Sequence, residues 1–364
     1  MTSRTHIDRL FFWSVMMLAV AGYVIFLSAS LGLLAAGNAS FGTVALKQTA
    51  SLILGMGVFY AFSRLPYALL RKYALFIMLG AIGINLLLFV PHLSLYHGGA
   101  ARWINIGSLS FQPSEFLKIA FIIYLAAWIQ FAKDKIKSMK FGLLPYIVIM
   151  AVLGGLLLAQ SDTDTLVIIG GTGIIMMLIA GMPIRHVALA ALVMAIAVTG
   201  VIAFRPYALQ RIKVFLDPST ATQGASYQIN QSLIAIGNGG FVGRGFGQSI
   251  QKFGYLPQPT DDSIFAVASE EFGLIGSSLL IALYVLFAGS AFRVATRSRD
   301  VFGGMVATGI GALIITESFM NMAAMMGLLP LSGVPLLFVS HGGTALIITL
   351  MAAGIVANIS KYRK

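Results

Sequence analysis

The chain contains no cysteine and few charged residues: Asp, Glu, Lys and Arg together make up 10% of its 364 residues. The absence of cysteine excludes disulfide bonds and thiolate metal sites, so a bound metal would need oxygen or imidazole ligands. Soluble domains of this length carry far more charge. Low charge, 58% hydrophobic residues and a mean hydropathy of +0.91 therefore exclude a water-soluble globule and indicate an integral membrane protein.

Acidic residues are scarce too: 12 stand against 24 Lys and Arg, which gives a formal net charge of +12. This charge could indicate nucleic-acid binding, but the basic residues are grouped in short connectors between apolar runs. That grouping is the pattern that sets membrane topology. With a cytoplasmic N-terminus, 16 Lys and Arg fall on the cytoplasmic side and six on the other. The count predicts that both ends are cytoplasmic and that the number of crossings is even.

Hydropathy predicts an all-α, polytopic membrane protein formed as a single transmembrane domain over residues 1–364. The first apolar run, from Leu10 to about Leu34, is too long for a cleaved signal peptide and is predicted to be a retained span. Residues 205–262 contain no spanning run and are predicted to form a large extracytoplasmic loop between spans seven and eight. About ten spans are predicted, near residues 10–34, 46–63, 73–91, 114–131, 143–159, 165–182, 187–204, 263–292, 302–322 and 336–358.

The large loop has two recognisable parts. Apolar residues at helical spacing predict an amphipathic helix from Tyr227 to Ile236. A glycine cluster follows, from Gly237 to Gly247. It does not match the spacing of a nucleotide-binding loop, so we interpret it as flexible backbone near a lipid substrate.

Two adjacent carboxylates, Asp261 and Asp262, lie where this loop meets the eighth predicted span. Acids at a helix start can be capping residues that the helix dipole favours. A carboxylate at the membrane edge can also have a raised pKa and act as a general base. Ionisable groups at this depth are commonly functional, so we favour the second interpretation.

Other charged residues are candidates on the outer face. Glu115 and Lys118 share one face of the fourth predicted span, and either a mutual ion pair or a pair lining an outward cavity fits their spacing. Arg102 is either an interface anchor beside Trp103 or a phosphate ligand. Asp162 and Asp164 lie in a tight link between spans, where a turn role is sufficient.

Four separated motifs resemble those of the SEDS family, which includes FtsW, RodA and SpoVE, and the resemblance covers nearly the whole chain. The segment Tyr255-Leu-Pro is closer to the division member FtsW. The motifs are Gly99-Ala-Ala-Arg-Trp-Ile-Asn-Ile-Gly107 with Gln112-Pro-Ser-Glu-Phe-Leu-Lys118, Gln160-Ser-Asp-Thr-Asp-Thr165, Tyr227-Gln-Ile-Asn-Gln-Ser-Leu-Ile-Ala-Ile-Gly237 with Gly243-Arg-Gly-Phe-Gly-Gln-Ser249, and Pro335-Leu-Leu-Phe-Val-Ser-His-Gly-Gly-Thr344.

The resemblance implies a peptidoglycan glycosyltransferase of the bacterial cytoplasmic membrane, which polymerises lipid II on the outer face with a class B penicillin-binding protein as transpeptidase partner. It places the essential aspartate at Asp262, with Asp261 in the position of a threonine. It implies substrate- or pyrophosphate-binding roles for Arg102, Lys118, Glu115, Asp162, Gln231, Ser232, Arg244 and Ser340. Departures include Ser161 and Asp164 in the family's QPDxGT motif, and His341 where tyrosine is usual.

The resulting hypothesis makes Asp262 the base that deprotonates an acceptor sugar while undecaprenyl pyrophosphate leaves the growing glycan. Arg102 and Lys118 would stabilise the leaving group, with a divalent cation such as Mg²⁺ or Mn²⁺ as a candidate cofactor. Glu270 and Glu271 lie about two helical turns after Asp262, ~12 Å deeper in the membrane by helix rise, and are predicted to be structural or gating residues. Two alternatives remain open: a flippase of lipid-linked precursors and a non-catalytic scaffold of the wall-synthesis complex.

Overall fold

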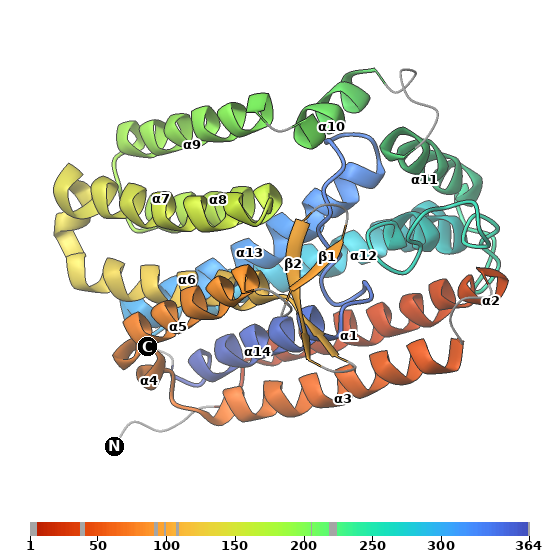
Figure 1. Cartoon of the computed structure of the whole chain (residues 1–364). Helices are drawn as coiled ribbons and strands as arrows, with labels where there is room; N and C mark the ends of the chain where they lie inside the picture. The colour runs from red at the N-terminus through yellow and green to blue at the C-terminus, as the bar shows by residue number, and fades with distance from the viewer. Residues whose placement is uncertain are drawn as a thin grey trace.

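The computed structural model describes residues 6–36, 41–90, 94–97, 100–106, 109–204, 206–217 and 224–362, which form mainly helices, with one small sheet and the loops that connect these elements (Figure 1). The α-helices are α1 (Arg9–Ser30), α2 (Leu33–Ala36), α3 (Phe41–Arg64), α4 (Tyr67–Lys72), α5 (Ala74–Leu86), α6 (Pro113–Ala132), α7 (Leu144–Ala159), α8 (Thr163–Ile179), α9 (Ile184–Phe204), α10 (Pro206–Leu216), α11 (Ala225–Gly239), α12 (Ile264–Thr296), α13 (Val301–Met325) and α14 (Gly343–Ile359). The remaining elements are the 3₁₀ turns η1 (Leu87–Phe89) and η2 (Lys133–Lys137), the π-helical turn η3 (Met139–Leu143), and the strands β1 (Ser94–His97), β2 (Ala100–Ile106) and β3 (Leu109–Phe111).

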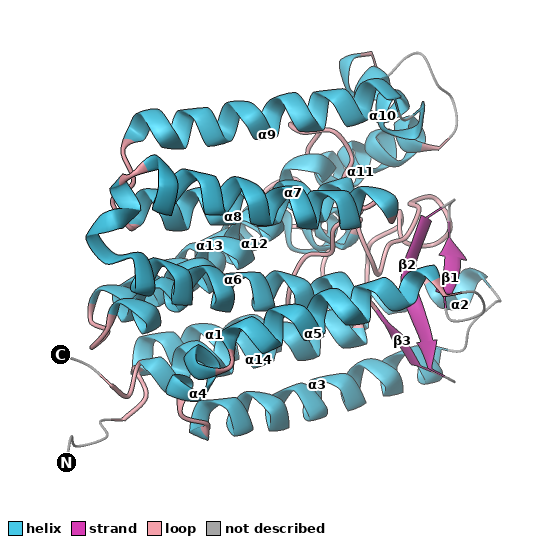
Figure 2. Cartoon of the chain, turned by 60° about the vertical axis from the view of Figure 1, so that its left-hand side comes forward, coloured by secondary structure: helices cyan, strands magenta, loops and turns pink. Residues whose placement is uncertain are grey.

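The long helices run side by side, and the two ends of the bundle differ (Figure 2). The start of α1 and the end of α14 meet at one end, where the backbone N–H of Asp8 donates to Ser360 Oγ at 3.0 Å. The sheet, α10 and α11 lie at the other end (Figure 2). The polar segments that the sequence assigned to one side of the membrane are therefore gathered at one end of the bundle.

Seven helices are long and apolar enough to cross a membrane within the described residues. Three predicted spans correspond to shorter apolar helices, Ala74–Phe89, Thr163–Ile179 and Gly343–Ile359. A 17-residue helix rises about 26 Å, slightly less than the hydrocarbon thickness. The polytopic all-α architecture is confirmed, whereas the count of ten spans is not.

Burial separates central from peripheral helices. Of the apolar stretch of α13, 78% is buried, against 11% in α9. Large apolar side chains such as Ile196 and Phe76 are more than 60% exposed on the outside of the bundle. Such surface is costly in water and favourable against lipid. Because their apolar stretches are buried to 67% and 78%, α6 and α13 form the core on which the candidate site is built.

The segment between η1 and α6 was predicted only as an outer connector, and it contains the three-stranded antiparallel sheet. Ile104 on β2 pairs with Ser94 on β1 and with Phe111 on β3. The pairing satisfies backbone groups of β2 on both sides. Arg102 is thereby placed on a central strand rather than on an irregular loop.

The glycine segment of the large loop packs tightly, which corrects the interpretation of it as flexible backbone. It lies against an interruption of α12 at Gly273, whose φ is +64°. Leu274 N–H donates to the carbonyl of Gly240 at 2.9 Å. A Cβ on Gly243, which has φ +81°, would lie 2.1 Å from the carbonyl oxygen of Glu271. Glycine is needed there for both backbone conformation and close approach.

The last predicted span began at residue 336, but α14 begins at Gly343. Residues 336–342 instead form a turn in which Phe338 has a φ of +70°. This turn contacts the segment before α12: His341 N–H donates to the carbonyl of Thr260 at 2.7 Å. Its non-helical path places Ser340 and His341 beside the acidic pair.

Candidate functional site

The acidic pair lies in a turn before α12. The N-cap residue of α12 is Ser263, and the first turn of α12 contains no acid, so the interpretation of Asp261 and Asp262 as capping or first-turn residues is wrong. The turn is held from two sides. Asn321 Nδ2 on α13 donates to the carbonyl of Asp262 at 2.9 Å, and Ser340 Oγ donates to the carbonyl of Asp261 at 2.7 Å.

The two carboxylates have different partners. Asp261 Oδ1 lies 3.4 Å from His341 Nδ1, and the His341 ring stacks on Phe26 with centroids 5.7 Å apart. The Asp262 carboxylate makes no hydrogen bond or ion pair with any residue that the structure describes. It is half-buried. Of the pair, Asp262 therefore has the carboxylate that a substrate proton can reach without displacing a side-chain partner.

Burial raises the pKa of Asp262 to about 7, and the negative charge of Asp261 acts in the same direction. The positive charges of Arg211 and Arg102 lower this pKa. A carboxyl whose pKa lies near neutrality exchanges a proton readily under physiological conditions. Such a perturbed group at the rim of a membrane protein is typical of an active site.

Two arginines lie near Asp262, each beside an aspartate at the start of α8, where Asp162 is the N-cap residue and Asp164 lies in the first turn. Arg102 donates to the carbonyl of Ser161, and its Nη1 lies 3.9 Å from Asp162 Oδ1. Arg211 on α10 is 3.2 Å from Asp164 Oδ2. Asp162 also caps α8, because its Oδ1 accepts from the backbone N–H of Thr165 at 3.4 Å, and its Oδ2 accepts from Thr165 Oγ1 at 2.9 Å. Asp162 and Asp164 therefore do more than form a turn: they contact the two arginines, and Asp162 caps α8.

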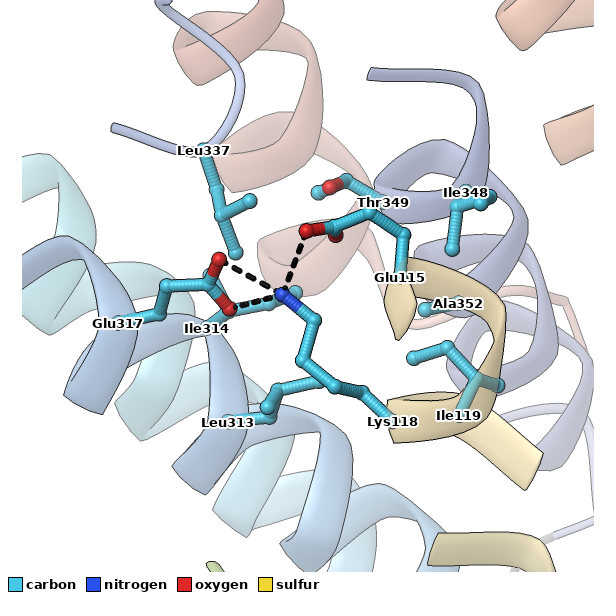
Figure 3. Close-up of a pocket in the computed structure, with 10 residues that line it drawn as sticks. All are labelled: Glu115, Lys118, Ile119, Leu313, Ile314, Glu317, Leu337, Ile348, Thr349 and Ala352. Atoms are coloured by element: carbon cyan, nitrogen blue, oxygen red, sulfur yellow. Dashed lines mark hydrogen bonds and ion pairs between the residues drawn. The ribbon is translucent and has the colours of Figure 1, made fainter. Parts of the chain in front are cut away.

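Lys118 is buried between two acids (Figure 3). Its Nζ lies 2.9 Å from Glu115 Oε1 and 2.6 Å from Glu317 Oε2 on α13. The three groups line a cavity of about 10 Å³, room for a single water. The ion-pair interpretation of Glu115 and Lys118 is confirmed, with Glu317 as a third member, whereas an outward cavity lined by the pair stays a prediction. Glu317 lies one helical turn, about 6 Å, before Asn321 on α13. Because Asn321 binds the carbonyl of Asp262, Glu317 lies about one helical turn from the acidic turn.

A second charged cluster forms at the other acidic pair, Glu270 and Glu271, and both are buried. Arg244 Nε lies 3.4 Å from Glu270 Oε1, and Lys252 Nζ lies 2.7 Å from Glu271 Oε1. Ser28 on α1 donates to Glu271 Oε2 at 2.5 Å. These contacts support a structural role, one of the two roles predicted for the two glutamates. They also place Arg244 with this cluster rather than with Asp262.

The remaining predicted site residues belong mainly to the support of the site. Ser232 on α11 is buried, and its Oγ donates to the carbonyl of Gln228 at 2.8 Å. Gln231 is half-buried on the same helix. Ser340 Oγ accepts from Leu336 N–H at 2.8 Å in addition to its bond to the acidic turn. Substrate contact by these three side chains stays a prediction.

The residues do not fit a metal centre made by protein ligands alone. Across the described part of the chain, no three His, Asp or Glu side chains converge as a candidate set of metal ligands. The acids near Asp262 are instead paired with arginines or with His341. We therefore derive no step that passes through a divalent cation.

Four residues near the site were given no site role from the sequence: Arg211, Asp164, Glu317 and Asn321. Glu317 carried a usable signal, since an acid within an apolar span needs a partner. Arg211 had no such signal, because one arginine in a long polar loop is unremarkable. Its position depends on the packing of α10 against the rest of the site.

Fold and site together define a multi-pass membrane protein with an arginine-flanked carboxylate at one end of its helix bundle. The family model of FtsW, RodA and SpoVE, described as "Cell cycle protein", matches residues 8–364. The chain belongs to this family.

Relatives and solved structures agree with this assignment. The chain is 38% identical to the probable peptidoglycan glycosyltransferase FtsW of Geobacter sulfurreducens, over 87% of this chain and 85% of the relative. It is 35% identical to stage V sporulation protein E of Bacillus subtilis, over 86% of each chain. Its fold is similar to that of Thermus thermophilus rod shape determining protein RodA, with a TM-score of 0.69, 21% identity and coverage of 98% and 97%. A chain of a peptidoglycan synthase complex that coordinates polymerization and crosslinking gives a TM-score of 0.77, with 22% identity and 98% coverage of both chains.

Proposed function

We propose that the protein is a peptidoglycan glycosyltransferase that polymerises lipid II outside the cytoplasmic membrane, in cell division or elongation, with Asp262 as its base. The observation that carries the proposal is the half-buried Asp262 carboxylate, which has no ion-pair partner among the described residues and lies beside two arginines. Family membership and the FtsW name of a 38% identical relative support the same activity.

The reaction follows from the position of the carboxylate. Asp262 takes the proton of the 4-hydroxyl of the acceptor sugar on lipid II as that oxygen bonds to the anomeric carbon of the growing glycan. The bond from this carbon to undecaprenyl pyrophosphate breaks, and the leaving group takes the electron pair. One base suffices for inversion, because pyrophosphate leaves without protonation. Arg102 stabilises the charge of the leaving group.

Lys118 has a different role in this scheme from the one its family position suggests. Its ammonium group is engaged by Glu115 and Glu317, within a cavity of about 10 Å³. These contacts favour a role in neutralising two buried acids below the site. The leaving group is left to Arg102, which is partly exposed, with 19% of its side-chain surface accessible.

The proposed function is tested by polymerisation of fluorescent lipid II by the purified protein, with and without a class B penicillin-binding protein as the proposed transpeptidase partner. We expect glycan strands that a muramidase digests. A protein that moved lipid II across vesicles without extending it would be a flippase. A protein that did neither, while the partner polymerised lipid II only in its presence, would be a scaffold.

The rate of polymerisation is expected to depend on pH through Asp262. Because its pKa is raised to about 7 and only the deprotonated form accepts a proton, the rate should rise about tenfold per unit below pH 7 and level off above it. Replacing Asp261 with Asn removes a charge that raises this pKa, so the rising limb should move to lower pH. Initial rates from pH 5 to 9 measure both curves. A wild-type rate that is already constant from pH 5 upward contradicts the assignment.

The proposed topology places Asp262 outside and both termini in the cytoplasm. The start of α1 and the end of α14 lie at the end of the bundle opposite the sheet, α10 and α11 (Figure 2). The 16-to-six division of Lys and Arg supports the assignment of that end to the cytoplasm.

A further inference from the structure

Gly333, in the loop between α13 and α14, lies at the meeting point of three charged groups. A methyl group built on its Cα would lie 3.7 Å from Arg211 Nη2, 4.0 Å from Arg102 Nη1 and 4.0 Å from Asp262 Oδ2. The three groups come from α10, β2 and the turn before α12. Figure 1 shows the loop after α13 passing beside α10. An exposed space therefore lies over Gly333, bordered by two guanidinium groups and the proposed base.

The backbone does not explain why this position lacks a side chain. The φ of Gly333 is outside the left-handed region, and each contact of an added methyl group would be an ordinary van der Waals distance. Alanine would fit there without strain. What a side chain would take away is the space between the charged groups.

Both arginines are held in position by contacts at the start of α8, and Arg102 Nη1 lies 3.9 Å from Asp162 Oδ1. Arg211 Nη1 binds Asp164, whose Oδ2 also accepts from Gly333 N–H at 3.4 Å. Arg102 Nη2 donates to the carbonyl of Ser161. The other Nη atom of each arginine borders the space over Gly333. Buried Arg102 Nε has no hydrogen-bond partner among the residues described, which leaves a donor unsatisfied in this structure.

We infer that the space over Gly333 receives a phosphate group of the polyprenyl-pyrophosphate substrate, bound between Arg211 and Arg102, and that Gly333 is glycine to admit it. The inference rests on the proposed function and adds Arg211 and Gly333 to its site. Paired guanidinium forks suit phosphate oxygens, which accept several charge-assisted hydrogen bonds at once. Asp262 becomes neutral as it takes the acceptor proton, so repulsion of the departing pyrophosphate falls during the step in which its charge grows.

The test measures binding without turnover. In the Asp262→Asn protein, we compare undecaprenyl pyrophosphate, undecaprenol and inorganic pyrophosphate as ligands, using tryptophan fluorescence in detergent. Arg211→Ala is expected to weaken undecaprenyl pyrophosphate binding about 10- to 100-fold and to leave undecaprenol binding unchanged. Weak binding of inorganic pyrophosphate, also reduced by Arg211→Ala, would show that the phosphate group itself is recognised.

Asp164→Asn is the matched control for Arg211. It removes the ion pair and keeps the guanidinium group, so undecaprenyl pyrophosphate binding should change less than about threefold if Arg211 binds phosphate directly. An equal loss in Asp164→Asn and Arg211→Ala overturns the inference, because Arg211 would then act only by fixing the start of α8 through its ion pair with Asp164. An equal loss of undecaprenol binding overturns it too, since the effect would not concern phosphate.

A graded series at Gly333 tests the space independently and removes no charge. Gly333→Ala, Gly333→Val and Gly333→Phe should weaken undecaprenyl pyrophosphate binding in that order and raise KM for lipid II in the Asp262-containing protein. Gly83→Val is the control, because nothing lies within 4 Å of a Cβ at Gly83. Normal binding and KM in a folded Gly333→Phe protein overturn the inference while polymerisation by the wild type upholds the proposed function. A wild type that binds undecaprenyl pyrophosphate as expected but makes no glycan supports the phosphate site and contradicts the proposed function.

Discussion

Asp262→Asn is expected to lower the rate of lipid II polymerisation by about 10²- to 10⁴-fold, the range associated with loss of a general base. Asparagine has nearly the same shape and cannot take the acceptor proton. The Asp262 carboxylate makes no bond to another described side chain, so its replacement breaks no contact of the fold. Glycan formation at saturating lipid II, with thermal unfolding of both proteins in detergent, measures the effect.

The matched control is Asp261→Asn at the neighbouring position. This change removes the Asp261 contact with His341 at 3.4 Å and should leave polymerisation within about threefold at pH 8, where Asp262 is mostly ionised in either protein. The reverse pattern, normal polymer from Asp262→Asn and none from Asp261→Asn, would assign the base to Asp261. Loss of activity in both, with both folded, would mean that the charge of the pair matters rather than one proton acceptor.

Lys118→Met is expected to destabilise the protein by about 3–5 kcal/mol, the usual cost of removing one partner from a buried ion pair. Methionine fills a similar volume but leaves Glu115 and Glu317 facing each other without their shared cation. Both acids are buried, at 3% and 0% exposure, so bulk water does not reach them, and the single water that the cavity can hold does not neutralise their charge. Unfolding in mixed micelles with increasing dodecyl sulfate measures the loss.

Two variants separate charge from position in this prediction. Lys137→Met removes an exposed lysine of η2 and should leave stability unchanged. The triple change Lys118→Met, Glu115→Gln, Glu317→Gln removes all three charges and should recover most of the stability lost in Lys118→Met, because no buried charge is left unpaired. A Lys118→Met protein as stable as the wild type would show that the two acids are protonated or hydrated without it.

The candidate site was predicted in part, and the reasons differ from residue to residue. Asp262, Arg102, Glu115 and Lys118 were found because charged residues are rare in this chain and their motifs resemble those of the family. Arg211 and Gly333 were not found, since an arginine in a polar loop and a glycine in a connector are common. Arg244 was grouped with the substrate site, whereas the structure pairs it with Glu270.

The fold shows the same division between local and long-range information. The apolar runs identified the membrane class and the approximate positions of the long apolar helices, because hydrophobicity acts within a segment. The sheet around Arg102 was missed, since strand pairing depends on distant partners and the segment has no spanning period. The glycine cluster was interpreted as flexible because its close contact with α12 is invisible in the sequence.

By itself, the sequence determined that this is a membrane protein with its polar segments on one side and a carboxylate pair where a loop meets a span. Composition, apolar run length and the asymmetry of Lys and Arg are enough for that, because each segment partitions between water and lipid by its own residues. Only the tertiary structure decided that His341 lies against Asp261 rather than Asp262, and that two arginines meet over Gly333. Those relations join residues far apart in the chain, so they depend on how the helices pack.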